Sequence, residues 1–208
     1  SPWIPPYLGI LTLDYITYPD VCLKANLEVI KRFPEVIFLP GFWVEMGMAA
    51  EPSGFGCKIQ FYSNTPPNVR PFVSDLESAV DLDQPNPKTD GLMPLILNFY
   101  RKVEPKVKDA GYAIKMIAAR GPMATASHLL GVTEFLMGVK LDPKRTHQLM
   151  KKMTRLTLDW LNAQVEVLSD VESIMLLDDL VGFLSPDDYL EFAHPYYKEI
   201  CGSFPDLI

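Results

Sequence analysis

Two adjacent carboxylates, Asp178 and Asp179, follow a short apolar run at residues 172–177. Side chains alternate between the two faces of an extended strand, so we expect only one of the pair to face a site at the strand's end. An inward carboxylate there could act as a general acid or base, a cation ligand or a hydrogen-bond acceptor for a substrate amine. The structural alternative is a helix cap or a salt bridge to a loop. The sequence leaves both interpretations open.

Arg120 and His128 form a second group of chemically useful side chains. Arg120 ends another apolar run and is followed by a Gly-Pro pair, which predicts a sharp exit from a strand. An arginine can bind a carboxylate or phosphate through two parallel N–H bonds, which predicts a substrate-binding role. An ion pair with either aspartate is an equal alternative. His128 lies a turn or two further on, as either a proton carrier or a packed histidine.

A third group is the loop at residues 42–48, which is rich in aromatic and methionine side chains. Phe42, Trp43 and Glu45 are candidates for contact with a substrate, and the aromatic and methionine side chains are suited to lining the face of a cofactor. Burial in the core is the structural alternative, because stripes of this kind are more often part of a core.

Metal ligands at the usual spacings are not encoded here. The three cysteines, Cys22, Cys57 and Cys201, are far apart and form no Cys-x-x-Cys pair. The three histidines likewise show no His-x-x-x-His spacing. We therefore expect neither a disulfide framework nor a complete metal site within these residues.

The composition is that of a globular chain, with 208 residues of which 48% are apolar and 22% charged. A formal net charge of −7 argues against nucleic acid or an anionic membrane as the main partner, since both bind clustered Lys and Arg. No run reaches the roughly 20 apolar residues of a membrane span. Residues 1–6 lack the charged-then-apolar order of a signal peptide. These features predict a cytoplasmic protein.

Alternating strands and helices are expected to position the three groups. The predicted strands lie at 35–40, 112–119 and 172–177, with one hairpin arm at 58–62, and the predicted helices lie at 19–33, 89–110, 144–169 and 185–200, with a short one from Ser74. Asp142 and Ser185 are predicted N-caps, each followed by proline. Pro105 and Pro195 are expected to kink or bend their helices.

This alternation predicts a parallel sheet with right-handed crossovers. The absence of a Gly-x-Gly-x-x-Gly turn favours an α/β TIM barrel, (β/α)8, over a doubly wound sheet. Such a barrel needs about 250 residues. We therefore expect residues 1–208 to be a single domain, a central portion of a barrel truncated at both ends. Barrel enzymes work at the carboxyl ends of their strands, so the three groups should meet at one mouth.

Three stretches resemble the uroporphyrinogen decarboxylase superfamily, and the resemblance as a whole covers nearly the whole chain. They are Arg120-Gly121-Pro122 through Gly131, Leu177-Asp178-Asp179 with Gly182, and Leu184-Ser185-Pro186 through His194-Pro195-Tyr196. In the porphyrinogen-decarboxylating branch, an aspartate follows the strand that matches 36–39, and an arginine-rich segment opens the chain. Here Pro40-Gly41-Phe42 stands at the first place and no such segment is present. His128 and Asp179 align with a family tyrosine and a family serine.

These departures favour the corrinoid-linked methyltransferase branch of the superfamily. The resemblance implies zinc, which activates a thiol as thiolate, and a corrinoid (methylcobamide) as the partner in methyl transfer. The family's zinc ligands would lie after Ile208, so no metal ligand is expected in this chain. The candidate catalytic residues are Asp178, Asp179 and His128, and the candidate substrate-binding residues are Arg120, Phe42, Trp43 and Glu45.

The expected partners are a small-molecule substrate and a corrinoid protein, with no nucleic acid and no membrane, and a homo-oligomer is compatible with the sequence. Two alternatives stay open. One is decarboxylation of uroporphyrinogen or another carboxylated small molecule, without a cofactor. The other is a non-catalytic binding protein on the same fold.

Overall fold

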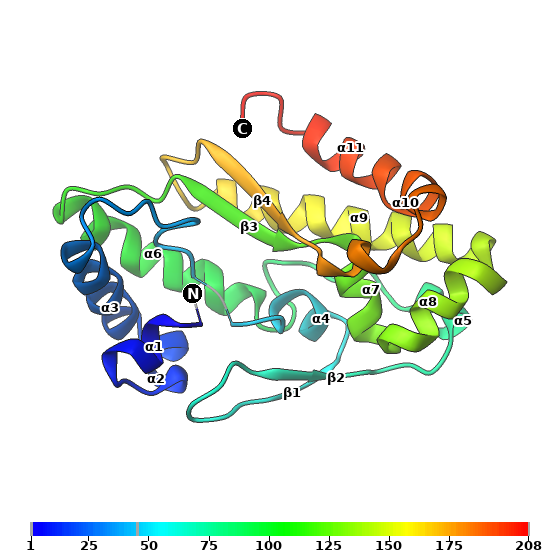
Figure 1. Ribbon diagram of the computed structural model, residues 1–208, viewed down its shortest axis with the longest axis horizontal. Coiled ribbons are helices and arrows are strands. Elements are labelled where there is room, and N and C mark those ends of the chain that lie inside the picture. Colours follow the sequence, from blue (N-terminus) through cyan, green and yellow to red (C-terminus); the bar gives the residue numbers. More distant parts are fainter. Residues whose placement is uncertain (1, 45, 208) are drawn as a thin grey trace.

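A computed structural model describes residues 2–44 and 46–207 as an assembly of helices around short strands (Figure 1). The helices are α1 (Ile4–Leu8), α2 (Thr12–Thr17), α3 (Pro19–Arg32), α4 (Ala50–Gly54), α5 (Leu76–Asp81), α6 (Met93–Asp109), α7 (Pro122–Leu130), α8 (Val132–Leu141), α9 (Pro143–Val165), α10 (Pro186–Phe192) and α11 (His194–Gly202), with the 3-10 helix η1 (Asp179–Phe183). The strands are β1 (Lys58–Gln60), β2 (Asn68–Arg70), β3 (Met116–Arg120) and β4 (Ser173–Leu177).

The parallel pair of β3 and β4 carries the candidate site at its carboxyl end. The register pairs Met116 with Ser173 and Arg120 with Leu177. The crossover between the two strands runs through α7, α8 and α9, as a parallel pair requires. This confirms the predicted strands at 112–119 and 172–177, although β3 begins four residues later than the apolar run. The pairing brings Arg120 and the aspartates after Leu177 to one edge of the sheet.

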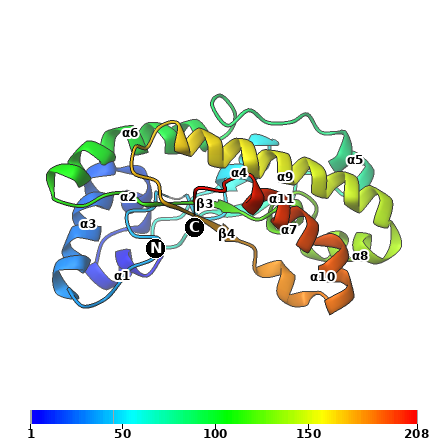
Figure 2. The ribbon, with the colours of Figure 1, turned by 90° about the horizontal axis from the view of Figure 1, so that it is seen from above.

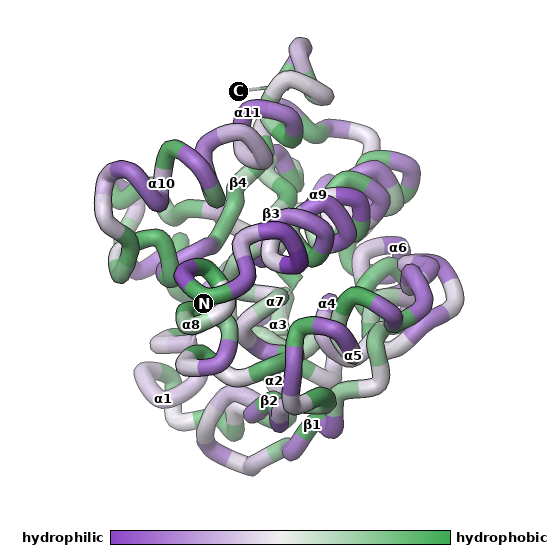
Figure 3. The backbone as a smooth tube through the Cα atoms, turned by 90° about the vertical axis from the view of Figure 1, so that its right-hand side faces the viewer, coloured by the Kyte–Doolittle hydropathy of each residue, from purple (hydrophilic) through white to green (hydrophobic). Residues whose placement is uncertain are grey.

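Helices cover one face of this pair (Figure 2). The apolar stripe of α9 is buried at Leu149, Met153, Leu156 and Trp160, while hydrophilic residues gather on its outward turns (Figure 3). Every residue of β4 is only half-buried, so its other face is left uncovered by the described elements and the α/β sheet does not close into a barrel. None of the described helices combines the length and apolar character needed to span a bilayer.

The predicted strand at 35–40 is wrong. The segment is irregular and pairs with no strand of the described chain, and Ile37 is 86% exposed. It forms one side of an open apolar groove of about 420 Å³ whose other side includes Tyr112 and Met116. Apolar composition predicted burial on both faces, but a strand also needs a neighbour to accept its backbone hydrogen bonds. Within the described residues that neighbour is missing.

The predicted hairpin arm is confirmed, because β1 pairs antiparallel with β2. The observed starts of the helices also lie close to the predicted ones. Asp142 caps α9 by accepting a hydrogen bond from Arg145 N at 3.1 Å. The short helix begins one residue later than predicted, since Asp75 rather than Ser74 caps α5.

Proline affects the two remaining helices differently. Pro105 lies inside α6, which continues to Asp109 without a break. The predicted helix at 185–200 divides at Ala193, because Pro195 in the first turn of α11 has no N–H with which to continue the ladder of α10. After this division α11 packs against α9, and its Tyr197 hydroxyl reaches Asp178, the residue that follows β4.

Candidate functional site

Asp178 leaves β4 and closes onto the N-terminus of α7. Its Oδ1 accepts a hydrogen bond from Ala124 N at 2.9 Å. Its Oδ2 accepts one from Met123 N at 2.9 Å and another from the Tyr197 hydroxyl at 2.7 Å. The first N–H groups of a helix have no partner within the helix. Asp178 therefore caps α7, which is the structural alternative that the sequence raised.

Gly121 allows the two strand ends to pack this closely. A Cβ atom at this position would lie 2.2 Å from Asp178 Oδ2, well inside van der Waals contact. The Gly121 backbone has φ −68°, a value that any residue can adopt, so the glycine is required by the carboxylate rather than by the backbone. Gly121 N also donates to Leu177 O at 2.9 Å, which continues the strand ladder to the cap.

Burial raises the pKa of Asp178 to about 6, with a small contribution from neighbouring Asp179, while the bonds from Tyr197, Met123 and Ala124 oppose the shift. Burial also raises the pKa of Tyr197, so its hydroxyl stays a donor. Asp179, by contrast, is exposed at the start of η1. Of the adjacent carboxylates, one is thus enclosed at the strand end and the other faces solvent.

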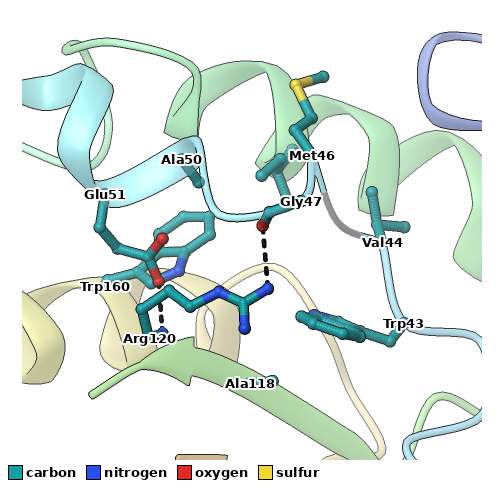
Figure 4. A pocket seen from close by; sticks show the side chains of 10 residues that line it. Trp43, Val44, Met46, Gly47, Ala50, Glu51, Ala118, Arg120 and Trp160 are labelled. Carbon is teal, nitrogen blue, oxygen red and sulfur yellow. Dashed lines mark hydrogen bonds between the residues drawn. The ribbon is translucent and has the colours of Figure 1, made fainter. Parts of the chain in front are cut away.

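Arg120 lies beside Trp43 and beneath the loop at 46–48 (Figure 4). Its Nη2 donates to Gly47 O at 3.1 Å, and its Cζ atom lies 5.8 Å from the centre of the Trp43 ring. Gly47 has φ +61°, a left-handed conformation that favours glycine. The cavity between these side chains has a volume of about 10 Å³. It holds about one water molecule.

Glu51 completes this cavity, and sequence reasoning missed it. The residue lies on the short helix α4 and is 3% exposed, and its Oε1 accepts a hydrogen bond from Arg120 N at 2.7 Å. Burial raises the pKa of this carboxyl, opposed by the bond from the Arg120 backbone. The available signal was weak, since Glu51 is a lone acid among small and apolar residues that no strand end or motif marks.

His128 contacts the same loop from α7. Its Nε2 lies 3.2 Å from Met48 Sδ. Burial and the Arg120 cation lower the pKa of the imidazole, which keeps it neutral at neutral pH. Consecutive residues of one loop, Gly47 and Met48, therefore contact the arginine and the histidine.

The remaining predicted site residues are placed elsewhere. Phe42 is buried and packs its ring 5.6 Å from the ring of Tyr112, which precedes β3 and lies away from Arg120. Glu45 lies outside the described residues. Among the residues that are described, neither Asp178 nor Asp179 forms an ion pair with Arg120. The structure thus brings together Arg120, Trp43 and His128, adds Glu51, and encloses Asp178 as a cap.

The described residues contain no group of three or more His, Cys, Asp or Glu side chains able to hold a metal ion. The site as described is a small cavity lined by Glu51 and Arg120, with the neutral His128 and the capping Asp178 beside it. Such a set can bind an anionic group, accept a proton and stabilise a helix N-terminus, and it provides no complete metal centre.

Known proteins resemble this chain over most of its length. A sequence model of the uroporphyrinogen decarboxylase (URO-D) family matches residues 8–207. Proteins named uroporphyrinogen decarboxylase from Psychromonas ingrahamii and Thermodesulfovibrio yellowstonii are 23% identical over 185 residues and 26% identical over 199 residues. These matches cover 87% and 91% of the chain but 50% and 55% of the relatives. The chain therefore spans about half the length of those relatives.

A solved structure, a methyltransferase from Methanosarcina mazei, matches the fold with a TM-score of 0.78 and 20% identity, covering 97% of this chain and 58% of that one. At that identity the likeness establishes the fold alone. The family match extends over nearly all of the sequence and includes β3, β4 and the site between them. The chain belongs to the uroporphyrinogen decarboxylase (URO-D) family.

Proposed function

We propose that the chain is the central portion of a (β/α)8 barrel enzyme that moves a methyl group between a corrinoid and a small-molecule thiol. One observation carries the choice of chemistry. Among the described residues, Arg120 is the one arginine that lines the strand-end cavity. A porphyrinogen carries many carboxylates and needs several arginines, whereas one arginine suits a substrate with a single anionic end.

The position of Phe42 supports the same choice. In the porphyrinogen-decarboxylating branch this part of the chain supplies an aspartate that stabilises a cationic pyrrole. Here the place is taken by Pro40-Gly41-Phe42, and the Phe42 side chain is buried against Tyr112. A buried phenyl ring cannot stabilise a cationic intermediate as a carboxylate does.

In this proposal each of the site residues has a definite role. Arg120 binds the anionic end of the thiol, and Trp43 lies against the guanidinium. His128 is neutral at neutral pH and accepts the thiol proton. Asp178 holds the N-terminus of α7 and thereby the helix that carries His128. Asp179, which is exposed beside the cap, is the second candidate catalytic carboxylate at the strand end.

Zinc is part of the proposal, but the described residues do not fit it, since they contain no group able to hold a metal ion. In this proposal its ligands lie outside the 208 residues. When bound, zinc would lower the pKa of the thiol. The corrinoid is carried by a partner protein, and the enzyme is cytoplasmic and needs neither nucleic acid nor membrane. Zinc analysis of the full-length protein after dialysis against a weak chelator is expected to give about one ion per chain.

The test of the reaction is demethylation of methylcobalamin by the full-length protein, followed by its visible spectrum with 3-mercaptopropionate as acceptor. We expect thiol-dependent loss of the methylcobalamin spectrum. The second candidate, porphyrinogen decarboxylation, is favoured by the names of the curated relatives. Release of carbon dioxide from uroporphyrinogen without demethylation would select that candidate, and neither reaction would indicate a binding protein.

A further inference from the structure

Two adjacent tyrosines on α11 make polar contacts with two different parts of the fold. The Tyr197 hydroxyl donates to Asp178 Oδ2 at 2.7 Å, whereas the Tyr196 hydroxyl lies 2.7 Å from His147 Nδ1 on α9. Successive residues of a helix project about 100° apart, because a turn takes 3.6 residues. The two hydroxyls therefore hold the same helix from two directions.

The orientation of α11 depends on such contacts, because the helix does not continue α10. The two helices are separated at Ala193, and Pro195 has no N–H with which to join their ladders. α11 packs against α9 (Figure 1), but apolar burial is non-directional. Among the described residues of α11, Tyr196 and Tyr197 carry the side-chain hydrogen bonds that reach another element. These bonds therefore set the rotation of α11 about its own axis.

His147 is itself held in place by α10. Its ring stacks on the ring of Phe192, with the ring centres 4.6 Å apart and the planes inclined by 19°, and Phe192 is buried at the end of α10. The second ring nitrogen, Nε2, lies 3.4 Å from Glu191 Oε1. The imidazole therefore has little freedom to turn away from Tyr196.

The contact between His147 and Tyr196 persists in either tautomer of the imidazole. A tyrosine hydroxyl can donate to an unprotonated Nδ1 or accept from a protonated one. In the second arrangement the hydroxyl donates to His147 O at 3.3 Å. Burial raises the pKa of Tyr196 to about 12, so the hydroxyl keeps its proton in both arrangements.

We propose that His147 is a positioning residue, which holds Tyr196 and thereby fixes the rotation of α11 that places the Tyr197 hydroxyl on Asp178. The bond from Tyr197 to Asp178 is 2.7 Å long, and a separation of about 3.6 Å is no longer a hydrogen bond, so a displacement of about 1 Å breaks it. The inference goes beyond the proposed function and does not depend on it, because Asp178 reports the effect without any substrate.

The Asp178 carboxyl reports the position of Tyr197, because the bond from Tyr197 opposes the rise in its pKa to about 6. Carboxyl NMR titration of the full-length protein measures that pKa. Tyr196→Phe removes the hydroxyl and keeps the ring, and His147→Ala removes the other partner of the contact. We expect the pKa of Asp178 to rise above 6 in both variants, as it should in Tyr197→Phe.

Rescue and non-additivity distinguish positioning from a general loosening of the fold. In His147→Asn the amide oxygen takes the place of Nδ1, so the pKa of Asp178 should return to the wild-type value. Adding Tyr196→Phe to Tyr197→Phe should cause no further rise, because the bond to Asp178 is already lost. Ile200→Val is the matched control, since Ile200 is buried on the same helix and the change removes a methyl group but neither hydroxyl.

The proposal is overturned if the pKa of Asp178 is unchanged in Tyr196→Phe and His147→Ala, or if the effects of Tyr196→Phe and Tyr197→Phe add in full. An equal rise in Ile200→Val, or no rescue by His147→Asn, would also contradict it. If His147→Ala does not fold, Tyr196→Phe, which lacks only one oxygen atom, supplies the same comparison.

Discussion

Replacing Asp178 by alanine tests how the strand end controls α7. The change removes the acceptor for Met123 N, Ala124 N and the Tyr197 hydroxyl together. Loss of a helix cap costs about 1 kcal/mol, and an unpaired buried hydroxyl costs about 1–3 kcal/mol. Relief of the buried charge offsets part of this. We expect Asp178→Ala to lower the unfolding free energy by about 2 kcal/mol at pH 7.

The pH dependence of that loss is a stricter test. The native pKa of Asp178, about 6, lies above its ordinary value of 3.8, so the native state binds the proton more tightly. The contribution of the Asp178 carboxyl to the unfolding free energy is therefore fully present below pH 3.8 and is lost as the pH rises through 6. The loss caused by Asp178→Ala should then be larger at pH 5 than at pH 7 by about 1.3 kcal/mol.

Urea unfolding of the full-length protein at the two pH values measures this difference, and amide hydrogen exchange at Met123 and Ala124 reports the cap directly. Asp179→Ala is the matched control, since Asp179 is exposed and adds only a small part to the raised pKa of Asp178. It should leave exchange at the two amides unchanged and reduce the stability difference between the two pH values only slightly. Equal stability of Asp178→Ala and wild type at both pH values, with unchanged exchange at the two amides, would refute the cap.

Three further substitutions test neighbouring contacts. Tyr197→Phe removes a hydrogen bond that holds the pKa of Asp178 down, so the pKa should rise above 6 in a carboxyl NMR titration; an unchanged value would contradict the contact. Gly121→Ala places a Cβ atom 2.2 Å from Asp178 Oδ2. We expect it to lower the unfolding free energy, measured with urea, by more than about 2 kcal/mol. A variant as stable as wild type would show that the strand ends are not so closely packed. Arg120→Lys keeps the positive charge but loses the planar guanidinium that can donate two parallel hydrogen bonds to a carboxylate. The KM for 3-mercaptopropionate should therefore rise about tenfold with kcat nearly unchanged. An equal rise in the KM for the neutral thiol 2-mercaptoethanol would argue against anion binding.

Much of the framework could be predicted because local signals and tertiary packing agree. The apolar stripe and the Asp142 cap both indicated α9, and both are present. The two paired strands were predicted from apolar runs followed by Arg120 and Asp178. The shared edge of the sheet then followed from parallel pairing alone.

The failures arise where local composition leaves the tertiary partner undetermined. The run at 35–40 has the composition of a buried strand, but pairing depends on a neighbour that no local pattern specifies. Phe42 and Trp43 are adjacent and aromatic, yet one packs against Tyr112 and the other lies beside Arg120. Glu51 was missed because its significance comes from a contact across 69 positions of sequence.

The most direct test of the proposed reaction is to offer the full-length protein both substrates and identify the product by mass spectrometry. The mixture contains methylcobalamin, 3-mercaptopropionate and uroporphyrinogen. Arg120 is the one arginine among the described residues that line the cavity, which predicts that the S-methyl thioether forms and that the porphyrinogen keeps all its carboxylates. Decarboxylated porphyrinogen without any thioether would contradict the account.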